Sequence, residues 1–173
     1  MLLVIDIGNT NTSLGIFKGN ELINTFSLSS DIKKTSDEYG ISLLAILNHN
    51  NLTKEIKGAI VSSVVPQLCE IYKNAILKYL NIKAISLSYK SKMPVQLKLD
   101  NNKEIGADRI ANATAASIKY KLPAIVIDFG TATTFDIVDK NSCFIGGIIA
   151  PGLKIQANSL SQFTSKLPKL KIE

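Results

Sequence analysis

The sequence predicts an α/β fold made of two related halves, each of which begins with a meander of three β-strands. The first observation is an internal repeat, because VIDIGNTNTSLGIF at residues 4–17 is similar to VIDFGTATTFDIV at residues 126–138. The second is the pattern of each copy, in which an apolar strand enters a polar Gly/Asn/Thr turn and leaves it as another strand. The third is a content of 46% apolar residues in 173, which is enough for a buried core.

The repeat extends beyond the two hairpins. Without gaps it aligns Asp6 with Asp128, Gly8 with Gly130, and Thr12 with Thr134. After the first copy the segment ELINTFSL alternates apolar and polar residues, and after the second the segment CFIGGIIAPGL is long and apolar. Each of these segments is therefore expected to form the third strand of a meander.

Helices and strands are expected to alternate in the rest of the first half. They are a helix over 36–48, a strand GAIVSSVV, a helix from Pro66, a strand AISLS and a helix over 105–120. The first helix is expected to start at Ser36 and Asp37 and to bury a face made of Ile41, Leu44, Ala45 and Leu47. Proline suits a first helical turn, which supports the start at Pro66. We therefore expect a first domain of residues 1–121 with the order βββαβαβα.

The second half, residues 122–173, is expected to contain a meander and one helix over about 153–165, in the order βββα. Compared with the first half, a portion of type αβ or βαβα is lacking. This indicates either a C-terminally truncated version of a longer architecture or a remainder that comes from another polypeptide.

Composition argues against two classes of partner. The formal net charge is +6, but the lysines are scattered singly or in pairs, without a basic stripe interleaved with aromatic residues, so we expect no nucleic-acid partner. The apolar runs are far shorter than the roughly 20 residues of a membrane span. The opening segment MLLVIDIGNTN breaks at Asp6 before a signal-type apolar region develops. A cytoplasmic protein without a membrane partner is therefore expected.

The two hairpin tips are candidate phosphate-binding sites. Glycine lets the backbone approach a ligand, and main-chain N–H groups with short polar side chains supply donors. In the first tip these side chains are Asn9, Thr10, Asn11, Thr12 and Ser13. Asp6 and Asp128, at the ends of apolar strands, could hold a cation that neutralises the phosphates. A single tip could be an ordinary turn with an aspartate, but two copies in register favour a nucleotide site.

A third candidate lies in EIGADRIANATAASIKY, which is expected to be a helix with Gly106 in its first turn. Arg109 is the only arginine among 20 lysine and arginine residues. Its planar group can bind a carboxylate or phosphate with two hydrogen bonds, which a lysine ammonium cannot do. Asp108 could orient an acceptor hydroxyl and take its proton. The alternative is a structural ion pair of Arg109 with Asp108 or Glu104.

Together these motifs resemble a known family. DIGNTNTSLGIF, VSSVVP, EIGADRIAN, DFGTATTFD and GGIIAPGL, in this order, are similar to type III pantothenate kinases. The resemblance implies a duplicated ribonuclease H-like fold of the actin-like and sugar-kinase-like ATPases. It also implies ATP-dependent phosphorylation of pantothenate to 4′-phosphopantothenate, the first step of coenzyme A biosynthesis, by a homodimer that uses Mg-ATP and a monovalent cation, potassium or ammonium.

The resemblance also assigns roles to residues. It implies ATP contacts by Asp6, Ile7, Gly8, Asn9, Thr10, Asn11, Thr12, Ser13 and Thr131, with Asp6 near the magnesium ion. Pantothenate would be bound by Gly106, Ala107, Asp108 and Arg109, with Asp108 as the catalytic proton acceptor. Asp128 would bind the monovalent cation. Leu99 and Asn102 stand where the family pattern often carries a tyrosine and a proline.

Two other functions are compatible with the same motifs. One is a non-catalytic relative, or an inactive fragment, that acts as a regulatory accessory factor of the family. The other is a sugar kinase or chaperone-type ATPase of the same superfamily, which the short chain disfavours because those proteins carry larger insertions.

Overall fold

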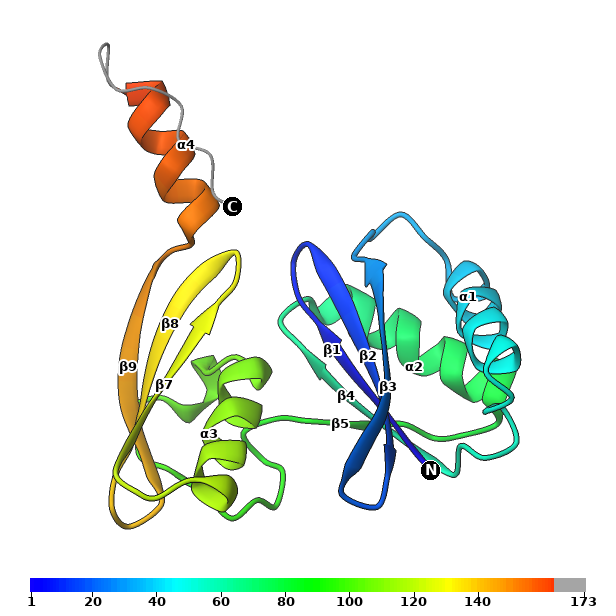
Figure 1. The fold of residues 1–173 in the computed structure, drawn as a ribbon, viewed down its shortest axis with the longest axis horizontal. Coiled ribbons are helices and arrows are strands. Elements are labelled where there is room, and N and C mark those ends of the chain that lie inside the picture. Colours follow the sequence, from blue (N-terminus) through cyan, green and yellow to red (C-terminus); the bar gives the residue numbers. More distant parts are fainter. Residues whose placement is uncertain (164–173) are drawn as a thin grey trace. The chain divides into compact units, whose positions relative to one another are not determined.

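The computed structural model describes residues 1–163, which form an α/β protein with two β-sheets (Figure 1). The chain divides into two compact units. Unit 1 contains residues 1–91 and 106–110, and unit 2 contains residues 92–105 and the described residues from 111 onward. Each unit has its own sheet and its own apolar core.

The sheet of unit 1 has five strands in the order β3-β2-β1-β4-β5. The strands are β1 (Leu2–Ile7), β2 (Asn11–Lys18), β3 (Glu21–Ser29), β4 (Gly58–Ser63) and β5 (Ile85–Ser86). The first three form the expected antiparallel meander, and β4 then pairs in parallel with β1. Alternate residues of β1 and β2 are buried, because successive side chains of a strand point to opposite faces of the sheet.

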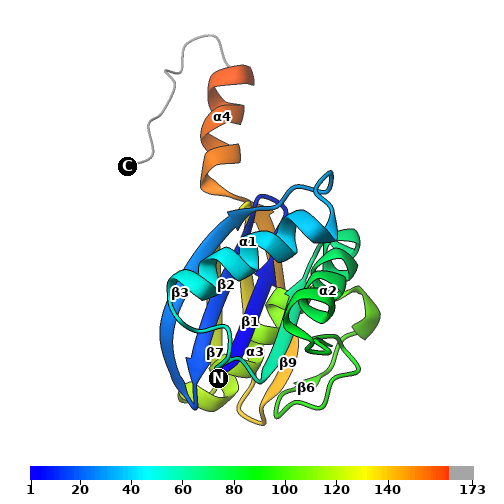
Figure 2. The ribbon, with the colours of Figure 1, turned by 90° about the vertical axis from the view of Figure 1, so that its right-hand side faces the viewer.

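Helices α1 (Ser36–His49) and α2 (Pro66–Leu80) cover one face of this sheet (Figure 2). The core between them is made of aliphatic and aromatic side chains, among them Leu3, Ile5, Ile7, Leu14, Ile16, Leu43, Leu47, Leu68, Tyr72 and Ile76. Pro66 occupies the first turn of α2, as expected. The opposite face of the sheet carries the polar side chains of β1 and β2, including Asp6 and Ser13, both exposed.

Helix α1 differs in detail from the expectation. Its N-cap is Thr35, one residue before the expected start, and Thr35 and Glu38 form a reciprocal capping box. The buried residues are Tyr39, Gly40, Leu43 and Leu47, so the predicted face was wrong at Ile41 and Ala45, which are exposed. The buried face of α1 begins at Tyr39, because the Tyr39 hydroxyl reaches the backbone of Ser29 and Asp31.

The sheet of unit 2 has four strands in the order β6-β9-β8-β7. They are β6 (Gln96–Leu97), β7 (Ala124–Phe129), β8 (Ala132–Val138) and β9 (Cys143–Pro151). The meander β7-β8-β9 matches the expectation, whereas the short strand β6, parallel to β9, was not predicted.

Two helices and a short 3-10 turn accompany the sheet of unit 2. The 3-10 turn at Asn102–Glu104 leads into α3 (Ala107–Lys119), and α4 (Leu153–Phe163) follows β9. Ala113 and Ala116 of α3 pack against Val126, Val138 and Phe144 of the sheet. The expected end of the last helix, residues 164–165, lies outside the described residues. None of the helices within residues 1–163 is long and apolar enough to cross a membrane.

The two hairpins differ by one residue at their tips. Ile7 pairs with Thr12, while Phe129, the equivalent of Ile7, pairs with Thr133. The ungapped alignment of Thr12 with Thr134 was therefore wrong in three dimensions. Thr12 and Thr133 are the equivalent residues, and both are buried.

The compact units do not follow the repeat along the chain. The repeat predicts a boundary between residues 121 and 122, whereas most of α3 packs within unit 2. Only residues 106–110, which include its first turn, belong to unit 1. The boundary after residue 121 therefore stays a prediction about the repeat. In the fold, the small side chains of α3 pack against the sheet of unit 2.

Candidate functional site

The β1–β2 hairpin presents a polar tip. Its turn is closed by a hydrogen bond of 3.0 Å from the Gly8 N–H to the Asn11 carbonyl. A Cβ atom on Gly8 would lie 3.1 Å from that carbonyl oxygen, so the turn fits a glycine best. Asn9, Thr10 and Asn11 are exposed. The tip therefore offers main-chain and side-chain donors without a bulky side chain, as a phosphate site requires.

Two predicted contact residues of this hairpin point away from the tip. Ile7 lies in the core, and Thr12 is fully buried on the same face. The Thr12 hydroxyl lies 2.9 Å from the Ser30 hydroxyl, and the Ser30 N–H donates to the Thr10 carbonyl at 2.9 Å. Their side chains thus hold the tip in place, and only their main-chain groups could meet a ligand.

Ser30 is held in turn by a residue that sequence reasoning did not single out. The Tyr39 hydroxyl accepts a hydrogen bond from the Asp31 N–H at 2.9 Å and lies 3.0 Å from the Asp31 carbonyl and 3.2 Å from that of Ser29. The segment on both sides of Ser30 is therefore fixed to α1. Only a buried tyrosine at the start of the helical stripe could have indicated this link.

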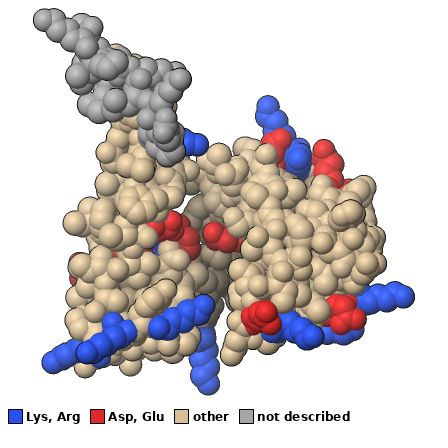
Figure 3. All heavy atoms as spheres, viewed as in Figure 1, with Lys and Arg blue, Asp and Glu red and all other residues tan. Residues whose placement is uncertain are grey.

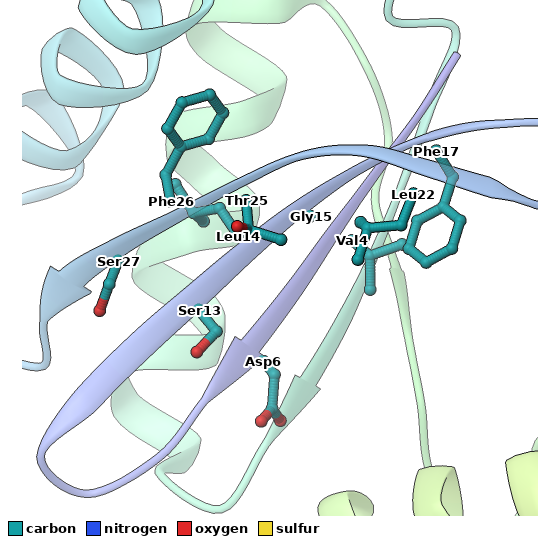
Figure 4. A pocket seen from close by; sticks show the side chains of 10 residues that line it. All are labelled: Val4, Asp6, Ser13, Leu14, Gly15, Phe17, Leu22, Thr25, Phe26 and Ser27. Carbon is teal, nitrogen blue, oxygen red and sulfur yellow. The ribbon is translucent and has the colours of Figure 1, made fainter.

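A cavity of about 510 Å³ lies against the polar face of the unit 1 sheet (Figure 4). Asp6, Ser13 and Ser27 point into its polar end, and Val4, Phe17 and Leu22 line its apolar end. Asp6 stands next to Ser13 in the β1–β2 register. This cavity is open to a ligand that carries charge at one end and an apolar group at the other.

The first turn of α3 contains the predicted acceptor residues. The Asp108 carboxylate accepts a hydrogen bond of 2.8 Å from the Arg109 N–H through Oδ1. A Cβ atom on Gly106 would overlap Asp108 Oδ1, so the carboxylate folds back over the glycine. Ala107 is buried, and Arg109 is half-buried. Glycine at residue 106 therefore provides the space that the Asp108 side chain occupies.

One residue links this turn to the hairpin within unit 1. The Val64 N–H donates to the Ile7 carbonyl at 3.1 Å, directly after Asp6. A Cβ atom on Gly106 would lie 3.3 Å from Val64 Cγ1. Asp6 at the end of β1 and Asp108 at the start of α3 are thus brought to the same part of unit 1. Val64 was part of a recognised motif, but no role had been assigned to it.

In unit 2, Asp128 has a fixed partner. Asn112 of α3 donates a hydrogen bond from Nδ2 to Asp128 Oδ2 at 3.0 Å. The sequence placed Asn112 four residues after Asp108 on the same helix but indicated no contact with Asp128. This bond orients Oδ2 of the Asp128 carboxylate, and Oδ1 is not part of it.

The second hairpin tip is held by a glycine that sequence reasoning missed. The Gly152 N–H donates to the Thr131 carbonyl at 3.0 Å, and the Gly130 N–H donates to the Ala132 carbonyl at 3.0 Å. A Cβ atom on Gly152 would overlap the carbonyl oxygens of Gly130 and Thr131. The end of β9 therefore packs directly on the tip that carries Thr131. The only signal was the APG sequence that ends the third strand.

Asp6 and Asp128 were both predicted to hold cations. The described residues contain no group of three or more His, Cys, Asp and Glu side chains that could enclose a metal ion. A single carboxylate such as Asp6 still fits a magnesium ion that is bound mainly by water and substrate phosphates. Asp128, with one oxygen fixed by Asn112, offers an oxygen ligand of the type that potassium-like ions accept.

The Lys and Arg side chains visible in Figure 3 are spread over both units.

Comparisons with known proteins agree on a family. The family model described as type III pantothenate kinase matches residues 2–173. A curated type III pantothenate kinase from Finegoldia magna is 47% identical over 174 residues, a match that covers 100% of this chain and 66% of the relative. The chain therefore spans just under two thirds of the length of that relative.

Solved structures show the fold. The Aquifex aeolicus Ppx/GppA phosphatase, in its type II variant, matches with a TM-score of 0.51 and 16% identity over 96% of this chain and 56% of the other. The ethanolamine utilization protein EutJ from Carboxydothermus hydrogenoformans matches with a TM-score of 0.50 and 11% identity, covering 93% and 56%. These likenesses, with the two meanders, confirm the predicted duplicated actin-like ATPase fold class.

Proposed function

Because this chain belongs to the type III pantothenate kinase family, we propose that it transfers the γ-phosphate of ATP to the hydroxyl group of pantothenate. The product is 4′-phosphopantothenate, and the reaction is the first step of coenzyme A biosynthesis. The observation that carries the proposal is the link through Val64, which brings the Asp6 hairpin and the Asp108 turn together in unit 1. Phosphoryl transfer needs these two parts side by side, because it depends mainly on positioning and charge neutralisation.

The β1–β2 hairpin binds the phosphates of ATP. The main-chain N–H groups of residues 8–13 and the exposed side chains of Asn9, Thr10, Asn11 and Ser13 donate to phosphate oxygens. Ile7 and Thr12 contribute through their main chain only, since their side chains are buried. Asp6 holds the magnesium ion, which supplies charge neutralisation at the phosphates when bound. Thr131, on the second tip, contacts the nucleotide.

The first turn of α3 binds the acceptor, pantothenate. Asp108 Oδ1 is occupied by the Arg109 N–H, so Oδ2 is the atom that accepts the proton of the pantothenate hydroxyl. The Arg109 guanidinium binds the carboxylate of pantothenate, for which its planar fork is suited. Gly106 and Ala107 contribute main-chain groups at the positive end of the helix dipole. Together they orient the hydroxyl toward the phosphate.

The remaining assignments follow the family. Asp128, oriented by Asn112, binds a potassium or ammonium ion beside the nucleotide. The enzyme acts as a homodimer in the cytoplasm. The likeness to the family over residues 2–173 supports these assignments.

The reaction can be tested with the purified chain, ATP, magnesium and either potassium or ammonium. Mass spectrometry should detect 4′-phosphopantothenate, and ADP should form at the same rate. N-acetylglucosamine, a hydroxyl acceptor of another chemical class, should give no product. The Finegoldia magna relative serves as the positive control. Absence of product from this chain with every cation, while the relative is active, would contradict the proposal.

A further inference from the structure

A row of polar side chains crosses four strands of the unit 1 sheet at the position of Asp6. In the strand registers, Asp6 of β1 lies opposite Ser13 of β2 and Ser62 of β4, and Ser13 lies opposite Ser27 of β3. Residues that are paired across neighbouring strands point to the same face of a sheet. Asp6, Ser13 and Ser27 share the polar face that Figure 4 shows. Ser62 is therefore the neighbour of Asp6 on the β4 side of that face.

The burial along β4 agrees with this placement. Ala59 and Val61 are 3% and 0% exposed and belong to the core between the sheet and the helices. Successive side chains of a strand alternate between the two faces, so Ser62 lies on the opposite face from Val61. Ser62 is nevertheless only 7% exposed, whereas Asp6 is exposed. A hydroxyl group is thus kept from water in the position next to an exposed carboxylate.

The Ser62 hydroxyl oxygen is buried and has no hydrogen-bond partner within residues 1–163. Buried hydroxyl groups are normally hydrogen-bonded, because giving up the bonds to water costs free energy. The next residue shows the usual arrangement, since Ser63 Oγ accepts from the Val65 N–H and donates to the Val65 carbonyl, both at 2.9 Å. Ser63 therefore stabilises the start of α2, whereas Ser62 contributes no such bond to the fold.

We propose that Ser62 is a positioning residue for the magnesium–nucleotide site, and that its hydroxyl donates to the Asp6 carboxylate when this carboxylate holds the cation. A carboxylate that binds a cation through one oxygen still has its second oxygen available as an acceptor. Groups that hydrogen-bond to a ligating carboxylate fix its orientation and raise the affinity for the metal. The inference rests on the proposed function, which makes Asp6 the magnesium ligand.

The bond requires rotation of side chains only. Neighbouring strands lie about 4.8 Å apart, and Asp6 and Ser62 are direct partners in the register. A serine side chain has three staggered rotamers, and a change of rotamer can turn the hydroxyl toward the neighbouring strand. The bond that is lacking in the free chain can therefore form in the bound state while the backbone of β1 and β4 stays in place.

Stability without ligand distinguishes this role from a structural one. Ser62→Ala removes a hydroxyl group that bonds to no group within residues 1–163, so the melting temperature of the free chain should stay the same or rise. Ser63→Ala is the matched control, because it makes the same substitution at the next residue of β4. It removes two hydrogen bonds to Val65 and should lower the melting temperature.

Nucleotide binding then tests the role toward Asp6. Calorimetry with the β,γ-imido analogue of ATP, once with magnesium and once with EDTA, separates the part of the affinity that depends on magnesium. For Ser62→Ala we expect the Kd with magnesium to rise by about fivefold or more, because the ligating carboxylate loses its donor. The Kd with EDTA should not change. Ser63→Ala should change neither Kd.

The outcomes separate this inference from the proposed function. If the unaltered chain does not bind the analogue with magnesium, both are overturned. If the unaltered chain binds and Ser62→Ala binds equally well with magnesium, only the role of Ser62 is overturned. An equal loss of affinity with and without magnesium would also overturn it, because the hydroxyl would then not act through Asp6. So would a melting temperature of Ser62→Ala that falls as far as that of Ser63→Ala, since the hydroxyl would then stabilise the fold.

Discussion

Asn112 on α3 holds Asp128 at the end of β7 through a hydrogen bond of 3.0 Å between Nδ2 and Oδ2. The bond joins a helix to the strand that carries the second hairpin. The Asp128 carboxylate is half-buried, and a hydrogen bond to a charged group contributes about 1.5–3 kcal/mol. Within residues 1–163, the amide of Asn112 therefore orients the Asp128 carboxylate.

The first prediction concerns this pair. Asn112→Asp should bring two carboxylates together, and their repulsion should lower the melting temperature of the chain in buffer without potassium. Added potassium should recover part of that loss, because a cation between the two carboxylates neutralises them. Asn112→Leu removes the donor without adding charge and should show no recovery. Thermal unfolding with and without potassium chloride measures both effects, and equal recovery in the two variants would contradict the assignment.

The second prediction concerns Gly106. Gly106→Ala should displace the Asp108 carboxylate, because the new Cβ atom would occupy the position of Oδ1. We expect kcat to fall by about tenfold or more while the free energy of unfolding changes by less than about 1.5 kcal/mol. Gly58→Ala is the control, since its Cβ atom meets only Leu2 Cδ1 at 3.4 Å. A kcat for Gly106→Ala equal to that of the control would count against the placement of Asp108.

The third prediction concerns Gly152. A Cβ atom at this residue would overlap two backbone oxygens, which cannot move without shifting the hairpin tip. Gly152→Ala should therefore lower the free energy of unfolding by about 1–3 kcal/mol and weaken nucleotide binding. Gly130→Ala on the same tip is the matched control for stability, because its Cβ atom would meet the Ala132 carbonyl at 3.4 Å, an ordinary contact. Denaturant unfolding measures the free energy of unfolding of both variants. Equal values for Gly152→Ala and Gly130→Ala would contradict the prediction.

The fourth prediction concerns pH. Hydrogen bonds from the Thr35 N–H and hydroxyl lower the pKa of Glu38 below its ordinary value of 4.5. A lowered folded-state pKa contributes stability that is present above pH 4.5 and is lost as the pH falls further. In Glu38→Gln, stability should therefore fall less steeply between about pH 5 and 3. Glu21→Gln, at the exposed start of β3, is the control. An unchanged slope in Glu38→Gln would refute the linkage.

The sequence was sufficient for the main architecture. The repeat and the alternation of ELINTFSL predicted both meanders, and Pro66 marked the start of α2, because these features depend on local pattern and helix-start preferences. Asp6, Gly8 and the exposed tip residues were also located correctly on a hairpin. Their contacts with ATP stay a prediction.

Other features depend on contacts between distant residues. The two-residue strand β6 exists because it pairs with β9, and its own sequence carries too few residues for a pattern. The equivalence of Thr12 with Thr133 follows from a tip that is one residue shorter, which an ungapped alignment hides. Val64, Asn112 and Gly152 act through neighbours in space. Only the packing of the folded chain shows that they hold the site.

The central claim is that Asp108 takes the proton of the pantothenate hydroxyl, and Asp108→Asn tests it most directly. The asparagine keeps the shape of the side chain and can still accept from the Arg109 N–H, but it cannot take the proton. We predict that kcat for 4′-phosphopantothenate formation falls by about 100-fold or more, while the Kd for pantothenate measured by calorimetry stays within about threefold. A variant that retains turnover within about threefold of the unaltered chain would contradict the account.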